Sequence, residues 1–470
     1  MGKFDQSESY QSKTSVTPPQ KPRAKRAYLA LLLVLCFGVQ SLAAQAAPQT
    51  RLVVRDKLGL TNLLNLCKLL TCSVDHGLGD PSGQLFLIKT PRALNAITGL
   101  LNINLGLISI ETDQVVQTQG ADAGPAPDYL TDTTPVSYYG STVWRGYLTQ
   151  PGNQLILTDK THATFNAAGA NVIVAVIDTG VDPTHPVLKN SLVTGYDFTR
   201  GKSGGSETAD VNQSTVAVLD HGKPAKVSQS TVAVLDQSSV AVLDSSEYAA
   251  FGHGTMVSGI VHLVAPQAKI MPLKAFHADG TGYNSDILSA IYYAVNHGAK
   301  VINMSFNYSS SSPELANAVN YANSLGVICV AAAGNDGQQA TVYPAALKSV
   351  IDVAATGDND IRSTFSNYGA PPVWLTAPGE GIMTTYPYGT WAAGWGTSFS
   401  APLVSGTAAL MVGTSPTKAT LKSLLKGGGA KTQAGAALSH AQPISDVQMG
   451  YGRLDTYQAM QAWRKAMGLK

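Results

Sequence analysis

Charged side chains are scarce in this chain of 470 residues. Asp, Glu, Lys and Arg make up only 13% of it, against roughly 25% in an average soluble protein. The formal net charge is +2, which is too small to indicate a nucleic acid or an anionic membrane as partner. A surface with so few charges and an abundance of glycine is typical of a compact secreted protein, and the length allows two to four domains.

Cofactor motifs are missing as well. The sequence contains no EF-hand loop, no dense carboxylate cluster and no His or Cys spacing typical of a metal site. It also lacks a glycine-rich phosphate loop. We therefore expect no cofactor, although a structural calcium ion bound by backbone carbonyls would leave no such motif.

Cysteine is rare, with four in all. Cys67 and Cys72 are close enough to pair in an oxidising compartment, but two apolar core residues would explain them equally well. Cys329 lies in the apolar run Val327-Ile328-Cys329-Val330 and is predicted to be a structural core residue. Cys36 belongs to an apolar segment near the N-terminus.

That N-terminal segment is an uncharged apolar run at residues 27–39. Four basic residues between positions 21 and 26 precede it, and small residues, Ala44 and Ala46, occupy positions −3 and −1 of a cut after Ala46. The pattern predicts a polar extension and signal peptide over residues 1–46, cleaved after Ala46, and hence a secreted protein. The run is short for a membrane span of about 20 residues, which disfavours the alternative of a retained signal anchor.

Residues 47–113 show a βαββαβ pattern. We expect strands at 51–55, 73–76, 84–89 and 105–111 and helices at 58–70 and 93–101. This order predicts a small ferredoxin-like domain, and it contains no catalytic motif. Residues 114–143, rich in Gln, Gly, Asp, Ala, Pro and Thr, are predicted to be a linker.

Strands and helices alternate again in residues 144–470. Apolar strands are expected at 173–177, 270–275, 301–305, 327–332 and 350–354, with helices at 285–297 and 313–325. Alternation of this kind predicts an α/β fold, a parallel sheet with helices on both faces. Ligand sites in such sheets lie beyond the carboxyl ends of the strands.

An insertion at residues 200–247 interrupts this pattern. It contains three near-copies of one heptapeptide, at 214–220, 230–236 and 238–244. Their polar and apolar residues alternate as in a strand. One interpretation is therefore a hairpin or edge-strand flap near the cleft at the carboxyl ends of the sheet strands, where a ligand would bind. A surface loop of low complexity without a catalytic role is the other.

Three motifs carry chemistry. An apolar strand ends in Asp178, while Gly252-His253-Gly254-Thr255 and Gly396-Thr397-Ser398 each open an apolar helix. A serine at a helix start lies beside unpaired N–H groups, which favour an oxyanion. Asp, His, Ser is one of the known chain orders of a catalytic triad, in which the histidine takes the serine proton and the aspartate orients the imidazole.

These motifs resemble those of the subtilisin-like serine proteases, the subtilases, over about residues 173–455. Four further segments carry the resemblance: Val301-Ile302-Asn303-Met304-Ser305, Ala332-Ala333-Gly334-Asn335, Tyr343-Pro344-Ala345 and Ala377-Pro378-Gly379. It implies that residues 144–470 form the catalytic domain and that Asn335 is an oxyanion donor beside the Ser398 N–H. It also implies a cis proline at Pro344.

The resemblance implies further that substrate binds as a strand between two extended segments. The expected substrate-binding residues are Gly280, Gly282, Ser305, Phe306, Asn307, Ala332, Ala333 and Gly334. The last three would form the wall of a specificity pocket with room for a sizeable apolar side chain. Many relatives carry Gly in place of Asn307, so a side chain there would narrow a subsite.

Residues 47–113 resemble the propeptide of these enzymes, an intramolecular chaperone and inhibitor that the enzyme cuts off, here within 114–143. An unrelated ferredoxin-like module is the alternative. We therefore predict a secreted, self-processing, monomeric serine endopeptidase that hydrolyses polypeptides through an acyl-enzyme. The alternatives are a maturation protease of narrow specificity and a catalytically silent binding protein. The silent protein would predict loss of a triad residue, and none is lost.

Overall fold

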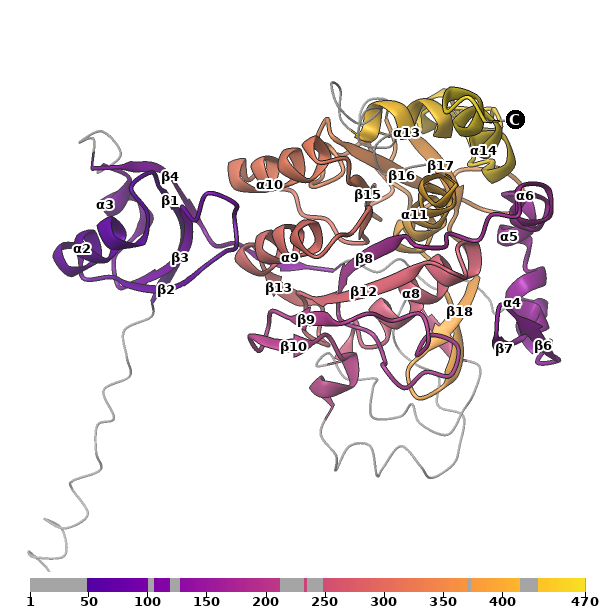
Figure 1. Cartoon of the computed structure of the whole chain (residues 1–470), viewed down its shortest axis with the longest axis horizontal. Coiled ribbons are helices and arrows are strands. Elements are labelled where there is room, and N and C mark those ends of the chain that lie inside the picture. The colour runs from indigo at the N-terminus through magenta and orange to yellow at the C-terminus, as the bar shows by residue number, and fades with distance from the viewer. Residues whose placement is uncertain are drawn as a thin grey trace, which may run out of the picture. The chain divides into compact units, whose positions relative to one another are not determined.

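The computed structural model describes residues 49–99, 105–118, 127–211, 232–234, 248–369, 373–414 and 430–469 (Figure 1). The predicted signal peptide lies outside these residues. Residues from Thr50 onward belong to one unit, separate from residues 1–49. Within the described part of the chain, no helix is long and apolar enough to cross a membrane.

A mostly parallel sheet of eight strands forms the centre of the C-terminal part (Figure 1). Neighbours from β9 to β17 pair in parallel, and only β10 pairs antiparallel, with β9. In sheet order the strands are β10 (Lys202–Gly204), β9 (Gly195–Asp197), β12 (Lys269–Lys274), β8 (Ile173–Asp178), β14 (Val301–Met304), β15 (Ile328–Ala332), β16 (Val350–Thr356) and β17 (Leu375–Pro378). The predicted parallel α/β fold is confirmed.

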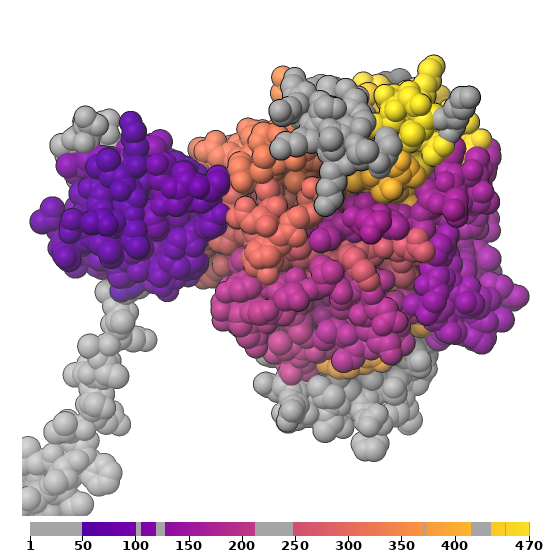
Figure 2. All heavy atoms as spheres, viewed as in Figure 1, coloured from indigo at the N-terminus to yellow at the C-terminus, as the bar shows by residue number. Residues whose placement is uncertain are grey.

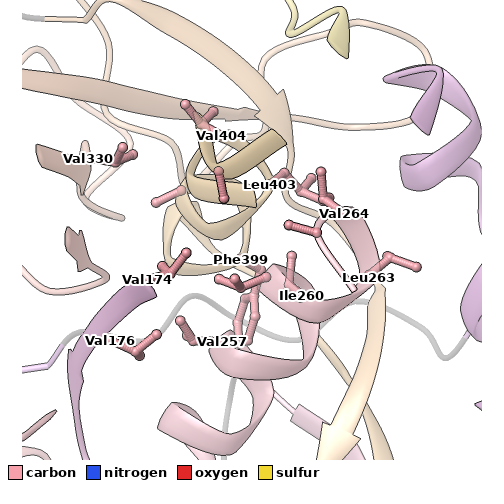
Figure 3. Packing of buried hydrophobic residues seen from close by; sticks show 14 of the residues in the cluster. Val174, Val176, Val257, Ile260, Leu263, Val264, Val330, Phe399, Leu403 and Val404 are labelled. Carbon is pink, nitrogen blue, oxygen red and sulfur yellow. The ribbon is translucent and has the colours of Figure 1, made fainter. Parts of the chain in front are cut away.

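Helices cover both faces of this sheet because the buried strands present apolar side chains in both directions. Along β8, Val174 and Val176 join one hydrophobic cluster, while Ala175 and Ile177 join the other. The first cluster contains α8 (His253–Val264) and α11 (Thr397–Gly413), and the second contains α9 (Asn284–Asn296) and α10 (Pro313–Ser324). Figure 3 shows side chains of β8, α8 and α11 meeting in the first cluster.

Helices near the beginning and the end of residues 144–470 pack against each other. Helix α6 (Thr158–Phe165) contacts α14 (Thr456–Ala466), with the Phe165 and Tyr457 rings 5.3 Å apart. These two segments lie side by side on the surface in Figure 2. The other α-helices that the structure describes in residues 144–470 are α4 (Arg145–Thr149), α5 (Pro151–Leu155) and α13 (Ala430–Leu438).

The N-terminal part contains a four-stranded antiparallel sheet in the order β2-β3-β1-β4. Its elements follow one another as β1 (Thr50–Asp56), α2 (Leu60–Leu70), β2 (Ser73–Gly77), β3 (Leu85–Thr90), α3 (Leu94–Thr98) and β4 (Leu107–Thr112). Its own small core includes Leu52, Leu63 and Phe86. Cys67 and Cys72 form a disulfide, which decides between the two interpretations of that pair.

Parts of the predicted linker form strands instead. β5 (Val115–Gln117) pairs antiparallel with β13 (Thr281–Tyr283), and β6 (Pro135–Tyr138) forms a hairpin with β7 (Ser141–Trp144). Three- and four-residue strands give no periodic signal of their own. Their hydrogen bonds depend on partners that the sequence pattern does not reveal.

The insertion also contains structure. Residues 200–211 hold β10 and the 3-10 helix η3 (Glu207–Asp210). Within the middle repeat, β11 (Val232–Val234) pairs antiparallel with β19 (Thr390–Gly394), which in turn pairs with β18 (Ile382–Tyr386). This repeat therefore provides an edge strand, while the other two copies lie outside the described residues.

Gly406 lets the two helices of the first cluster approach closely. A Cβ atom built on Gly406 of α11 would lie 2.6 Å from Cβ of Val264 on α8. We expect Gly406→Ala to lower the free energy of unfolding by about 1–3 kcal/mol, because the helices must move apart. Urea denaturation of the full chain, with Ser398→Ala as background, measures this. Gly99→Ala, where a Cβ atom meets nothing within 4 Å, is the control, and equal stability of both variants would contradict the expectation.

Candidate active site

The first two candidate residues meet where a strand ends and a helix begins. Asp178 is the last residue of β8 and His253 the first of α8. His253 Nδ1 lies 2.7 Å from Oδ1 of Asp178, which also accepts a hydrogen bond of 2.7 Å from the Thr179 N–H. A Cβ atom on Gly254 would lie 2.0 Å from the Gly180 carbonyl oxygen. Glycine after the histidine is therefore what allows this approach.

The surroundings of His253 favour its protonated form. Burial by itself lowers the pKa of the imidazole, but the negative charge of Asp178, the hydrogen bond to Asp178 and the charge of Glu207 outweigh it. The pKa of His253 is therefore raised above the ordinary value of 6.5. An imidazole that gains basicity in this way is suited to accept a proton.

Ser398 lies in the first turn of α11 and is buried. Its hydroxyl donates to the Ser305 carbonyl oxygen at 3.1 Å, and the Ser305 hydroxyl donates to the Ser398 carbonyl oxygen at 2.9 Å. The His253 ring is 5.7 Å from the ring of Phe399, between centroids. The first turns of α8 and α11 thus lie next to each other, with the imidazole beside the residue that follows the serine.

Asn335 follows β15 and contacts the same helix start. Its Oδ1 accepts hydrogen bonds of 2.9 Å from both the N–H and the hydroxyl of Thr397. The Thr397 hydroxyl in turn accepts a hydrogen bond of 3.1 Å from the Gly334 N–H. These contacts fix the plane of the Asn335 amide and direct its NH₂ group away from Thr397.

The predicted substrate-binding residues fall into three groups. Gly280 and Gly282 lie at the β13 edge, where β5 of the same chain occupies the hydrogen-bonding positions. The side chains of Phe306 and Ala332 are buried in hydrophobic clusters, so those two residues can meet a substrate only through their main chain.

The other predicted residues lie around the turn after β15. Ala333 and Asn307 are buried, at 3% and 4% exposure. A Cβ atom on Gly334 would lie 3.4 Å from Nδ2 of Asn307 and 2.4 Å from Nδ2 of Asn367. The substrate-binding roles of these residues and of Ser305 stay predictions.

Sequence reasoning missed several residues of this region. Asn367 holds the turn after β15, donating to the Ala333 carbonyl oxygen at 3.0 Å and accepting from the Asp336 N–H at 3.0 Å. The Thr179 hydroxyl accepts a hydrogen bond of 3.0 Å from the Gly254 N–H. Glu207 lies buried behind it. Only Thr179, inside the Asp-Thr-Gly motif, gave a signal that could have been used.

Several remaining predictions concern buried groups. The peptide bond before Pro344 is cis, as expected. Cys329 is buried, and its burial raises the pKa of the thiol to about 12. His185 and His262 are buried, and neither is among the hydrogen-bond partners described for Ser398. Burial lowers the pKa of both imidazoles. Among the residues that the structure describes, no three His, Cys, Asp or Glu side chains gather as a metal site.

The contact between Asp178 and His253 can be tested without any assumption about activity. In the full chain carrying Ser398→Ala, we expect the imidazole of His253 to titrate above 6.5 by NMR. Asp178→Asn should lower its pKa by about one unit or more, because a neutral amide no longer stabilises the imidazolium. Asp446→Asn, at a carboxylate paired with Arg362, is the control. An unchanged titration in Asp178→Asn would contradict the assigned contact.

Comparison with known proteins identifies the family of this arrangement. The model of the subtilase family of peptidases matches residues 169–452, the segment that contains the three candidate triad residues. A thermophilic serine proteinase from Bacillus sp. (strain AK1) is 34% identical over 290 residues, which cover 61% of this chain and 62% of that protein. The match therefore leaves more than a third of that relative uncovered.

Further relatives agree. Thermitase from Thermoactinomyces vulgaris is 33% identical over 52% of this chain and 76% of that protein. Subtilisin DY from Bacillus licheniformis is 35% identical over 57% of this chain and 85% of that protein.

A solved structure shows the same fold. Fervidolysin from Fervidobacterium pennivorans, described as a keratinolytic enzyme related to subtilisin, superposes with a TM-score of 0.65 at 24% identity. The match covers 88% of this chain and 61% of that one. With the family model and these relatives, we conclude that the chain belongs to the subtilase family of subtilisin-like serine proteases.

Proposed function

We propose that this protein is a secreted, self-processing serine endopeptidase in which Asp178, His253 and Ser398 act as the triad. The observation that carries the proposal is the 2.7 Å contact between His253 Nδ1 and Asp178 Oδ1 beside the first turn of α11. This contact leaves Nε2 as the nitrogen able to take a proton. A serine at a helix start next to such a base is suited to acyl transfer.

In the proposed acylation step, the Ser398 hydroxyl turns from the Ser305 carbonyl oxygen to Nε2 of His253. The oxygen attacks the peptide carbonyl while the imidazole takes its proton and later gives that proton to the leaving amine. Asp178 keeps the ring in place and stabilises the imidazolium. Water then hydrolyses the acyl-enzyme by the same proton transfers in reverse.

The oxyanion would be bound by the Ser398 N–H and the Asn335 amide. The first four N–H groups of a helix have no partner within it, and Ser398 lies among these in α11. Thr397 fixes the amide plane of Asn335 through two hydrogen bonds of 2.9 Å. Removal of one such amide donor costs about 3 kcal/mol of transition-state stabilisation in subtilisin itself.

Pairing between β5 and β13 supports self-processing. The Thr118 N–H donates to the Gly280 carbonyl oxygen at 2.8 Å, and the Asn284 N–H donates to the Gln114 carbonyl oxygen at 2.9 Å. An extended segment of the chain itself thus occupies the strand edge proposed to receive substrate, as in binding by strand addition. We place the processing bond between Thr118 and Pro127, inside the predicted linker.

Carboxylates of the N-terminal domain at two helix starts support its role as an intramolecular inhibitor. At α9, Asp113 accepts hydrogen bonds from the N–H and the hydroxyl of Ser285, at 2.7 and 2.9 Å. At α10, Glu111 accepts one of 2.6 Å from the hydroxyl of Ser312, the residue that caps this helix. Carboxylates at helix N-termini are stabilising.

The disulfide between Cys67 and Cys72 supports secretion, because disulfides persist mainly in oxidising compartments. It agrees with the predicted signal peptide at residues 1–46. We also propose that the enzyme acts as a monomer on polypeptides.

Self-processing is the direct test. We would express residues 47–470 with and without Ser398→Ala and measure intact masses. Loss of an N-terminal fragment ending between Thr118 and Pro127 in the wild type alone is the expected result. An intact wild type would count against the propeptide assignment. Equal cutting of both forms would show that another protease is responsible.

The helix-end contacts give a second test. Glu111→Gln combined with Asp113→Asn should weaken the complex between the cut propeptide and the enzyme at least about fivefold, because each charged cap contributes about 0.5–2 kcal/mol. Peptidase activity is measured in a dilution series of the self-processed, unseparated protein. Lys89→Gln, at an exposed pair with Asp75, is the control. Half-maximal activity at an unchanged dilution would show that these contacts do not hold the propeptide.

A further inference from the structure

Glu207 is a fully buried carboxylate for which the triad mechanism has no use. It lies in η3, in the stretch that the sequence assigned to an insertion, and its exposed fraction is 0%. A buried charged group is costly unless it is well hydrogen-bonded. The carboxylate must therefore be stabilised by its contacts, and these contacts lead directly to the candidate active site.

Each oxygen of Glu207 binds the start of the histidine helix. Oε1 accepts hydrogen bonds from the Gly252 N–H at 2.8 Å and from the Thr179 hydroxyl. Oε2 accepts from the N–H and the hydroxyl of Thr255, at 3.2 and 2.6 Å. Two of these four donors are backbone groups at the N-terminus of α8, so the carboxylate caps the helix whose first residue is His253.

The two threonine hydroxyls carry the connection to the aspartate strand. Thr179 directly follows Asp178, and its hydroxyl accepts from the Gly254 N–H at 3.0 Å while donating to Glu207. The Thr255 hydroxyl accepts from the Asp182 N–H at 2.9 Å while donating to Glu207. Glu207 therefore accepts hydrogen bonds from both segments and ties the Asp178 turn to the start of α8.

We propose that Glu207 is a positioning residue of the peptidase: it fixes the Asp178 turn against the start of the His253 helix and adds a second negative charge behind the imidazole. This inference rests on the proposed function, because it concerns how the same triad is held. It assigns a role to a residue that never contacts the substrate.

A carboxylate is required here because all four partners donate. A glutamine side chain would place an NH₂ group against backbone N–H groups that also need acceptors, and so would leave donors unpaired. The charge reaches the base as well, since Glu207 is one of the groups that raise the pKa of His253. Position and charge therefore act on the same imidazole.

Other titratable groups face Glu207. Burial and the nearby charge of Asp178 raise its pKa, while its hydrogen bonds and Lys274 lower it, and the result is about 7. Lys274 is itself buried and donates to the Thr179 carbonyl oxygen at 2.8 Å and to Asp210 at 2.6 Å. Tyr388 is also close to Glu207: burial, the charge of Asp182 and the charge of Glu207 raise the pKa of its phenol. The charges acting on Glu207 thus come mainly from Asp178, which raises its pKa, and from Lys274, which lowers it.

The test compares pH profiles of the self-processed full-length protein on a synthetic peptide substrate. Glu207→Gln should lower kcat roughly 10- to 100-fold with little change in KM, because the reacting groups lose their alignment. The acid limb of kcat/KM should move to lower pH by roughly half a unit or more, since the imidazole loses a neighbouring negative charge. A purely structural role would not move this limb.

Asp455→Asn is the matched control. Asp455 is buried and caps α14 by accepting a hydrogen bond of 2.8 Å from the Gln458 N–H. The substitution therefore removes an equivalent buried charge at a position away from the triad. Its acid limb should coincide with that of the wild type. A shift in the control equal to that of Glu207→Gln would overturn the inference.

Two further measurements keep the test decisive if Glu207→Gln does not mature. Thr255→Val removes one hydroxyl donor and should lower kcat, while Thr255→Ser should restore it. In the uncut Ser398→Ala chain, Glu207→Gln should lower the pKa of His253 by NMR. Unchanged kcat in Thr255→Val together with an unchanged His253 titration would overturn this inference but not the proposed function. Absence of Ser398-dependent cleavage by the wild type would overturn the proposed function and the inference with it.

Discussion

The contact between Gly180 and Gly254 is the constraint on which the rest of the site depends. At 2.0 Å between a Cβ position on Gly254 and the Gly180 carbonyl oxygen, no other residue fits without moving a backbone segment. The end of β8 and the start of α8 can therefore meet almost backbone to backbone. The side chains of Asp178 and His253 can then reach each other to form their 2.7 Å contact.

The layers of the fold keep these segments in place. Side chains of β8 alternate between two hydrophobic clusters, so the strand is held from both faces. On one face, α8 and α11 pack against each other and bring their N-termini to the carboxyl edge of the sheet (Figure 3). A buried scaffold thus positions polar groups at its rim, where parallel sheets generally bind ligands.

From the sequence, we could predict the strands and site residues that lie in a continuous, recognisable pattern. β-branched runs located β8 and β14 to within a residue or two, and the motifs around Asp178, His253 and Ser398 singled out groups that the structure brings to neighbouring turns. The triad roles themselves stay predictions. Short strands such as β9 and β17 were not predicted, because three or four residues are too few to show an alternating pattern.

Contacts between distant segments could not be predicted in this way. Glu207 meets partners 28 and 48 positions away, at Thr179 and Thr255. Asn335 meets Thr397 at a separation of 62. An isolated glutamate in an irregular stretch has no local feature that distinguishes it from a solvated one. Only the fold reveals that its side chain points inward.

The pairing of β5 with β13 bears on what the proposed mature enzyme would attack. In the proposed self-processing, β5 would leave the edge of β13, and any extended backbone of suitable length could then pair with the main-chain groups of that edge. In helices and in the inner strands of sheets, the main-chain N–H and C=O groups are already hydrogen-bonded to each other. Such segments therefore have no main-chain groups available to pair with this edge. Under this proposal, selection at the edge would depend on whether a stretch of the target is locally unfolded, and a protein's resistance to cleavage would measure its local stability.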